Sequence, residues 1–121
     1  MKSLTDLRDH LRQFADERDW NQFHSPKNIV MALSVEVAEL QEHFQWLTEE
    51  QSKNLDARTK AEVADEIADV QNYLVRLADK LDIDILEAAT VKFAKNQKKY
   101  PADLVRGSSK KYSQYQTNDG D

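Results

Sequence analysis

The sequence predicts an all-α fold: a four-helix bundle whose subunits assemble into an oligomer. The chain has 121 residues with only two Gly and two Pro. Hairpin turns depend on glycine-rich punctuation, so an all-β fold is disfavoured. Apolar residues also recur every three or four positions through four long segments, which is the periodicity of amphipathic helices. The length allows one domain, or one subunit of an assembly.

The first two helices are expected over residues 3–21 and 25–47. The first segment begins at Ser3, whose hydroxyl can cap a helix, and its apolar positions then follow helical spacing. In the second, Ser25 is an N-cap residue followed by Pro26 in the first turn, a common helix start. An apolar stripe continues from there to Leu47.

Two more helices are expected after a polar connection. Residues 48–58 predict a loop with a short helical turn, and an apolar stripe predicts the third helix over 59–81. Asp82 or Asp84 can cap the fourth helix, which ends at Tyr100 because Pro101 interrupts the pattern. These helices form one domain over 1–106, and the basic and polar tail, 107–121, is expected to be partly disordered.

The second and third helices are apolar on more than one side. Such helices bury their extra apolar surface against a neighbour, and in this chain the neighbour expected is a second copy. The sequence therefore predicts a homodimer or a homotetramer.

The charge of the chain is unevenly distributed. It has 17 Lys+Arg against 22 Asp+Glu, a net charge of −5, yet residues 92–111 alone hold seven basic side chains and one acidic one. The remaining, strongly acidic part repels a long polyanion, so nucleic-acid binding is not expected. The absence of Cys excludes disulfides, thiolate nucleophiles and Cys-type zinc sites.

Hydropathy indicates where the chain functions. The mean hydropathy is −0.79, and no apolar run approaches the ~20 residues that a membrane span needs. The N-terminal residues lack the apolar region of a secretory signal. A cytoplasmic protein without a membrane partner is expected.

Two acidic pairs lie beside the apolar stripes of the second and third helices. At about 100° of rotation per residue, Glu36 and Glu39 flank one stripe, and Glu66 and Asp69 flank the other. Converging carboxylates repel one another unless a cation lies between them. Oxygen ligands suit Mg²⁺, with Mn²⁺ as a substitute, and the missing Glu-x-x-His motif argues against a di-iron site. The alternative is that these are surface charges.

Three polar residues share one side of the fourth helix, because Lys92, Asn96 and Tyr100 recur every four positions. An ammonium, an amide and a phenol can all donate hydrogen bonds to phosphate oxygens. The alternative is a lysine extended along the helix surface and an asparagine that ends the helix.

Several segments in a fixed order resemble the MazG-like nucleotide pyrophosphohydrolases. They are Glu36-Val-Ala-Glu39, Glu66-Ile-Ala-Asp69 and the stretch from Lys92 through Tyr100 to Pro101. More narrowly, residues 17–24, 44–46 and 108–112 are similar to the dCTP pyrophosphatase branch of that family. The resemblance covers about residues 10–112.

The resemblance implies an enzyme of nucleotide-pool housekeeping that hydrolyses a nucleoside triphosphate, dCTP or a related dNTP, to the monophosphate and pyrophosphate with Mg²⁺. The implied metal ligands and catalytic residues are Glu36, Glu39, Glu66 and Asp69. The implied phosphate contacts are Lys80, Lys92, Asn96 and Tyr100. The implied lining of the base and sugar pocket is Trp20, Trp46 and Tyr73.

Two alternatives stay open at this point. Aromatic residues at helical spacing are also typical of a core. A non-catalytic helical module that binds nucleotides or a partner would use Trp20, Trp46 and the basic tail as a recognition surface. In addition, Leu11 stands where some members of the family have a pocket histidine, so the base preference is not fixed by the resemblance.

Overall fold

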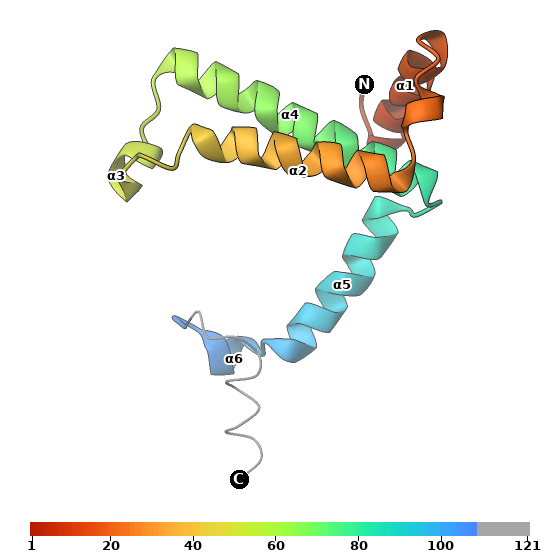
Figure 1. Cartoon of the computed structure of the whole chain (residues 1–121). Helices are drawn as coiled ribbons and strands as arrows, with labels where there is room; N and C mark the ends of the chain where they lie inside the picture. The colour runs from red at the N-terminus through yellow and green to blue at the C-terminus, as the bar shows by residue number, and fades with distance from the viewer. Residues whose placement is uncertain (109–121) are drawn as a thin grey trace. The chain divides into compact units, whose positions relative to one another are not determined.

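The structure is a computed structural model that describes residues 1–108. Over these residues all regular structure is helical, which confirms the predicted all-α class (Figure 1). The elements are α1 (Leu4–Glu17), the 3₁₀ turn η1 (Asn21–Phe23), α2 (Pro26–Glu42), α3 (Glu49–Ser52), α4 (Ala57–Lys80), α5 (Ile85–Lys99) and α6 (Ala102–Val105). Most of the tail expected to be disordered, 109–121, lies outside the described residues.

The chain forms two compact units. The first, Met1–Ile83, contains α1 to α4, and the second begins at Asp84 and contains α5 and α6. The first unit thus holds three of the four long helices that the sequence predicts. A single four-helix bundle and its oligomeric assembly stay predictions.

The helices begin where the sequence places capping side chains. The side chain of each capping residue accepts a hydrogen bond from a backbone N–H of the first turn, which otherwise lacks a partner. The capping residues of α1, α2, α3, α4 and α5 are Ser3, Ser25, Thr48, Asp56 and Asp84. Of the two candidates for the start of α5, Asp84 is therefore the cap.

The ends of the first two helices were predicted wrongly. α1 ends at Glu17 rather than at residue 21, because Asp19 has a φ of 53° and the Trp20 N–H bonds back to the carbonyl of Ala15 at 2.9 Å. α2 ends at Glu42 rather than at 47, since turns follow it as far as Thr48. The apolar residues keep their helical spacing through both turns, so this spacing does not show where either helix ends.

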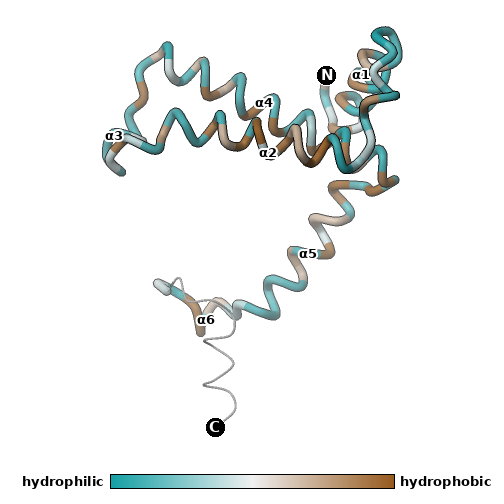
Figure 2. The backbone as a smooth tube through the Cα atoms, in the orientation of Figure 1, coloured by the Kyte–Doolittle hydropathy of each residue, from teal (hydrophilic) through white to brown (hydrophobic). Residues whose placement is uncertain are grey.

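The first unit is built on an antiparallel pair of helices, α2 and α4, which lie side by side with α3 in their connection (Figure 1). Hydrophobic stretches of both helices occur along this pair (Figure 2). Ile29 of α2 and Val63 and Val75 of α4 are buried, together with Ala15 of α1. These side chains form the core that fixes the separation of α2 and α4.

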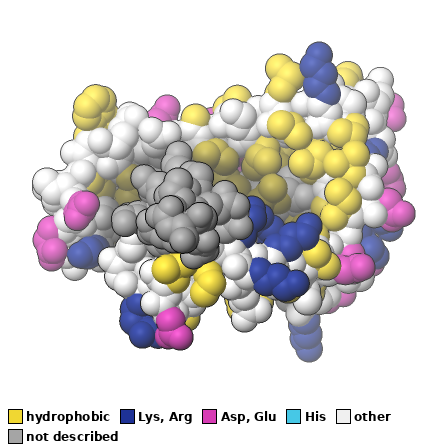
Figure 3. Space-filling view, turned by 90° about the horizontal axis from the view of Figure 1, so that it is seen from below, with side chains coloured by type: hydrophobic (Ala, Val, Ile, Leu, Met, Phe, Trp, Pro, Cys, Tyr) yellow, Lys and Arg dark blue, Asp and Glu magenta, His cyan; other side chains and the backbone are white. Residues whose placement is uncertain are grey.

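Much apolar surface of α2 stays exposed. Val30, Met31 and Val35 have 47%, 59% and 56% of their surface accessible, and hydrophobic side chains are visible on the face drawn in Figure 3. This agrees with the prediction that α2 is apolar on more than one side. No helix among residues 1–108 combines the length and apolar character needed to cross a membrane.

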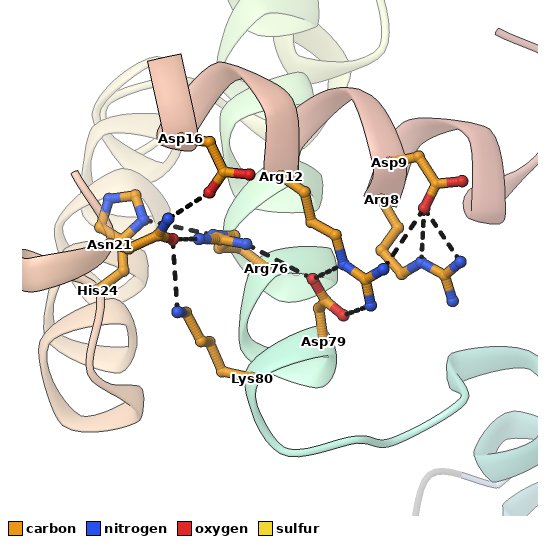
Figure 4. Close-up of polar contacts among 9 residues, drawn as sticks. All are labelled: Arg8, Asp9, Arg12, Asp16, Asn21, His24, Arg76, Asp79 and Lys80. Carbon is orange, nitrogen blue, oxygen red and sulfur yellow. Dashed lines mark hydrogen bonds and ion pairs between the residues drawn. The ribbon is translucent and has the colours of Figure 1, made fainter. Parts of the chain in front are cut away.

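An ion pair attaches α1 to α4 (Figure 4). The Arg12 guanidinium donates two hydrogen bonds to the Asp79 carboxylate, the one from Nε measuring 2.7 Å. The Asp79 side chain is only 9% exposed, and Arg76 Nη1 lies 3.5 Å from its Oδ2. The hydrogen bond from Arg12 holds the pKa of Asp79 below its ordinary value.

We therefore expect Asp79→Asn to lower the free energy of unfolding by about 2 kcal/mol at pH 7, because it removes the buried anion that the guanidinium groups of Arg12 and Arg76 share. A carboxylate with a lowered folded pKa stabilises the fold above its ordinary value of 3.8 and stops doing so as the pH falls through the folded value. The difference in the free energy of unfolding between the wild type and the variant should thus disappear in acid. Urea unfolding at several pH values measures it, with Glu17→Gln, at an exposed ion pair of α1 that does not include Arg12, as the control.

Candidate functional site

Three glutamates from α2 and α4 converge at one point. One carboxylate oxygen from each of Glu36, Glu39 and Glu66 lies within 4.8 Å of the other two. Glu36 and Glu39 are three residues apart on α2, so they lie on neighbouring turns of one face, and Glu66 faces them from α4. The predicted meeting of carboxylates from two helices is therefore present for these three residues.

Two of these carboxylates have an oxygen that is buried and unpaired. Oε2 of Glu36 and Oε2 of Glu66 have no hydrogen-bond partner among the described residues. Leaving a buried charged oxygen unpaired is costly. A cation coordinated between the helices would satisfy both oxygens at once. Carboxylates exposed on the surface would need no such partner, because water would solvate them.

The raised pKa values in the cluster also indicate that it lacks a compensating positive charge among the described residues. Burial, followed by the nearby carboxyls of Glu39, Asp69 and Glu66, raises the pKa of Glu36 from 4.5 to about 7. Burial and then the Glu39 charge also raise the pKa of Glu66, while a hydrogen bond with Glu36 and the charge of His43 oppose the rise. Without a cation, the cluster relieves its repulsion by holding protons.

Asp69 occupies the edge of this cluster. Its charge raises the pKa of both Glu36 and Glu66, yet its carboxylate is not one of the three that lie within 4.8 Å of one another. The donor set consists of oxygens only, without Cys and with His43 outside the group. Such a set fits a hard divalent cation.

The predicted aromatic residues lie in three different settings. Trp20 follows α1 and packs edge-on against Phe14 and His24, with ring centroids 5.6 and 6.3 Å apart. Tyr73 is half-buried on α4, one turn beyond Asp69. Trp46 lies in the turn after α2 and is 87% exposed, so its ring is not part of a core within the described chain.

The predicted phosphate-binding residues lie in both units. Lys80 is the last residue of α4, and its Nζ is 3.5 Å from Oδ1 of Asn21. Lys92 and Asn96 are exposed on α5, and Tyr100 caps its C-terminal end, where its N–H bonds to the Asn96 carbonyl at 2.9 Å. Their spacing along α5 agrees with the prediction of a shared side.

A polar network around Arg76 was not predicted from the sequence. This guanidinium contacts Asn21, His24 and Asp79, and through Asp79 it is connected to Arg12 (Figure 4). Arg76 follows Tyr73 by three residues, and this spacing placed it on the predicted site face of α4. Its long-range partners are not visible in any local pattern.

Comparisons with known proteins identify a family and several relatives that this chain resembles. Residues 31–114 match the model of the MazG-like family. The chain is 42% identical to human dCTP pyrophosphatase 1 over 93% of its own length and 67% of the relative's. It is also 42% identical to the mouse protein of that name, over 92% of this chain and 66% of the relative.

A solved structure has a similar fold. The crystal structure of a pyrophosphatase from Archaeoglobus fulgidus is 45% identical in sequence and superimposes with a TM-score of 0.76. The match covers 80% of this chain and 91% of the archaeal one.

We expect Glu36→Gln to raise the melting temperature of the metal-free protein by about 5 °C at pH 8, because removing one like charge relieves about 1 kcal/mol of repulsion. The raised pKa means that the folded wild type binds a proton that the unfolded chain has released. Its stability in EDTA therefore falls as the pH rises from 4.5 to 7, and the variant should show less of this fall.

Thermal unfolding in EDTA at several pH values measures the melting temperature and its pH dependence, and repeating it in excess Mg²⁺ or Mn²⁺ measures the effect of the cation. Added cation should stabilise the wild type more than Glu36→Gln. Glu42→Gln, an exposed position on the same helix, serves as the control and should behave as the wild type. Equal cation effects on all three proteins would contradict the metal site.

Proposed function

The chain belongs to the MazG-like family, and we propose that it is a Mg²⁺-dependent nucleoside triphosphate pyrophosphohydrolase acting on dCTP or a related dNTP. The observation that supports this most directly is the cluster of Glu36, Glu39 and Glu66, with two buried carboxylate oxygens that lack a partner. The relatives named dCTP pyrophosphatase 1 cover almost the whole chain, which supports the substrate class.

In this proposal Glu36, Glu39 and Glu66, with Asp69 beside them, hold the cation. Bound Mg²⁺ would neutralise the triphosphate and act as a Lewis acid on its phosphoryl oxygens. Mn²⁺ suits the same oxygen donors. The four carboxylates come from two rigid helices, α2 and α4, so their positions do not depend on a loop.

Water is the proposed nucleophile, since the chain has no Cys and no histidine in the group of carboxylates. Glu36 or Glu39 accepts its proton as the water oxygen bonds to the α-phosphorus. The bond from the α-phosphorus to the bridging oxygen then breaks, and pyrophosphate leaves with that oxygen. The products are the nucleoside monophosphate and pyrophosphate.

The remaining site residues are proposed to bind the nucleotide. Trp20, Trp46 and Tyr73 would contact the base and sugar, and the two tryptophans have accessible ring surface for this. Lys80, Lys92, Asn96 and Tyr100 would donate hydrogen bonds to phosphate oxygens. The exposed positions of Lys80, Lys92 and Asn96 support such a role.

We also retain the predicted domain over 1–106, the tail from 107 and a cytoplasmic location as proposals. The family match spans residues from α2 to beyond α6, so it includes parts of both compact units. This supports a functional domain that extends over both.

The test is a panel of dNTPs and NTPs incubated with the protein and Mg²⁺, analysed for monophosphate and pyrophosphate. We expect dCTP or a related dNTP to be the best substrate and EDTA to stop the reaction. Glu39→Gln and Asp69→Asn should lower kcat by at least about a hundredfold, because each removes a charge that positions the cation.

Asp65→Asn is the matched control and should retain activity, since Asp65 is an exposed carboxylate on α4, the helix that carries Asp69. Release of the γ-phosphate alone would contradict attack at the α-phosphorus. A wild type that binds dNTPs but forms no product would instead favour the non-catalytic nucleotide-binding module.

We propose that the chain forms a homodimer or a homotetramer through the exposed apolar surface of its helices. Light scattering should give a mass of two or four times 14.0 kDa. Met31→Lys places a charge on exposed apolar surface and should weaken the assembly at least about tenfold, whereas Ser34→Lys, at an exposed polar position of α2, should not. A monomeric wild type would contradict this proposal.

A further inference from the structure

Arg76 is the only polar or charged side chain that is buried among the described residues, with 6% of its surface exposed. A buried guanidinium is costly unless its N–H groups are paired. Here Nε donates to Nδ1 of His24 at 3.3 Å, Nη1 approaches Oδ2 of Asp79 at 3.5 Å, and Nη2 donates to Oδ1 of Asn21. Arg76 thus links three separate positions (Figure 4).

Two of its three partners belong to the short segment that also contains Trp20. Asn21 is the residue after Trp20, and His24 is in edge-on contact with the Trp20 ring. The Trp20 N–H bonds to the Ala15 carbonyl at 2.9 Å, and the amide of Asn21 donates to Asp16. One backbone hydrogen bond and one side-chain hydrogen bond thus anchor this segment to α1, while Arg76 anchors it to α4.

We propose that Arg76 is a positioning residue for substrate binding: it holds residues 20–24, and with them the Trp20 ring, against α4 on the nucleotide side of the site. The inference rests on the proposed function, in which Trp20 contacts the base. In this proposal Arg76 does not touch the substrate, because each of its three nitrogens has a protein partner and the residue is only 6% exposed.

The position of Arg76 along α4 fits this role. Glu66, Asp69, Tyr73, Arg76 and Lys80 lie on one side of the helix at a spacing of three or four residues. At 1.5 Å of rise per residue, Arg76 lies about 10 Å along the axis from Asp69. In the proposed function the carboxylates of this face hold the cation, and the cation in turn binds the phosphates. The nucleoside would then extend toward the far end of the face.

The chemistry of the network requires a guanidinium. Its planar fork directs separate N–H groups to separate acceptors, which the single ammonium of a lysine cannot reproduce. His24 must be neutral to accept at Nδ1, and burial together with the charges of Arg76 and Lys80 lowers its pKa. Asp79, itself paired with Arg12, supplies the anion that compensates the buried charge.

The kinetic test compares Arg76→Met with the wild type on the best dNTP of the panel. A loosened Trp20 segment weakens ground-state and transition-state binding alike, so KM should rise about tenfold while kcat stays within about twofold. Arg76→Lys should recover only part of the affinity. Arg58→Met, at a 90% exposed side chain on the same helix, should leave both constants unchanged.

Fluorescence tests the position of the Trp20 ring independently of catalytic activity. In a Trp46→Phe background Trp20 is the only tryptophan, so acrylamide quenching reports its accessibility. Arg76→Met should raise the quenching constant about twofold, since the ring loses the His24 contact that Arg76 orients. Should Arg76→Met fail to fold, Asn21→Ala, which removes the acceptor of Arg76, replaces it with the same expectations. Asp16→Ala, which removes only the bond from Asn21 to α1, is then its control.

The positioning role is overturned if the folded variant shows unchanged KM and unchanged quenching, or if kcat falls as much as kcat/KM. A wild type that hydrolyses no nucleotide would contradict the proposed function instead. The quenching comparison, made on the protein without nucleotide, would then still decide whether Arg76 holds Trp20.

Discussion

The mutual repulsion of Glu36, Glu39 and Glu66 is the constraint on which the site depends. Three carboxylates within 4.8 Å are unfavourable in a half-buried position, and the core residues Ile29 and Val63 hold the two helices that bring them together. Hydrophobic burial therefore supplies the free energy that keeps the charges in contact. In the proposed function a divalent cation bound between the carboxylates would relieve this repulsion, so the same packing would serve both fold and function.

Helix α4 has opposite electrostatic character along its length. The part that faces α2 presents Glu66 and Asp69, whereas the last two turns present Arg76 and Lys80, with Asp79 compensating part of the positive charge. A nucleoside triphosphate bound with its cation at the first part would extend toward the second. In the proposed function α4 would thus fix the position of the cation as well as the position of the Trp20 segment.

The sequence predicts the helical class, the caps of α1, α2 and α5 and the shared face of Glu36 and Glu39, because each depends on local chemistry. Ser3, Ser25 and Asp84 cap helices through bonds to residues three positions away, and the Glu-x-x-Glu spacing places two carboxylates on one face. The helix ends at 17 and 42 were missed, since periodicity continues through residues whose backbone leaves the helix.

What local pattern cannot predict is pairing over long separations. Two such pairs are Arg12 with Asp79 and Arg76 with Asn21, whose members are distant in sequence. Each of these residues taken alone resembles an ordinary polar residue of the surface. Burial distinguishes them: a guanidinium at 6% exposure is retained only if its partners offset the desolvation cost. The partners of Arg76 include Asn21, which follows Trp20 in the sequence, and His24, whose ring contacts the Trp20 ring. The network therefore constrains a segment of the proposed site that lies outside the long helices.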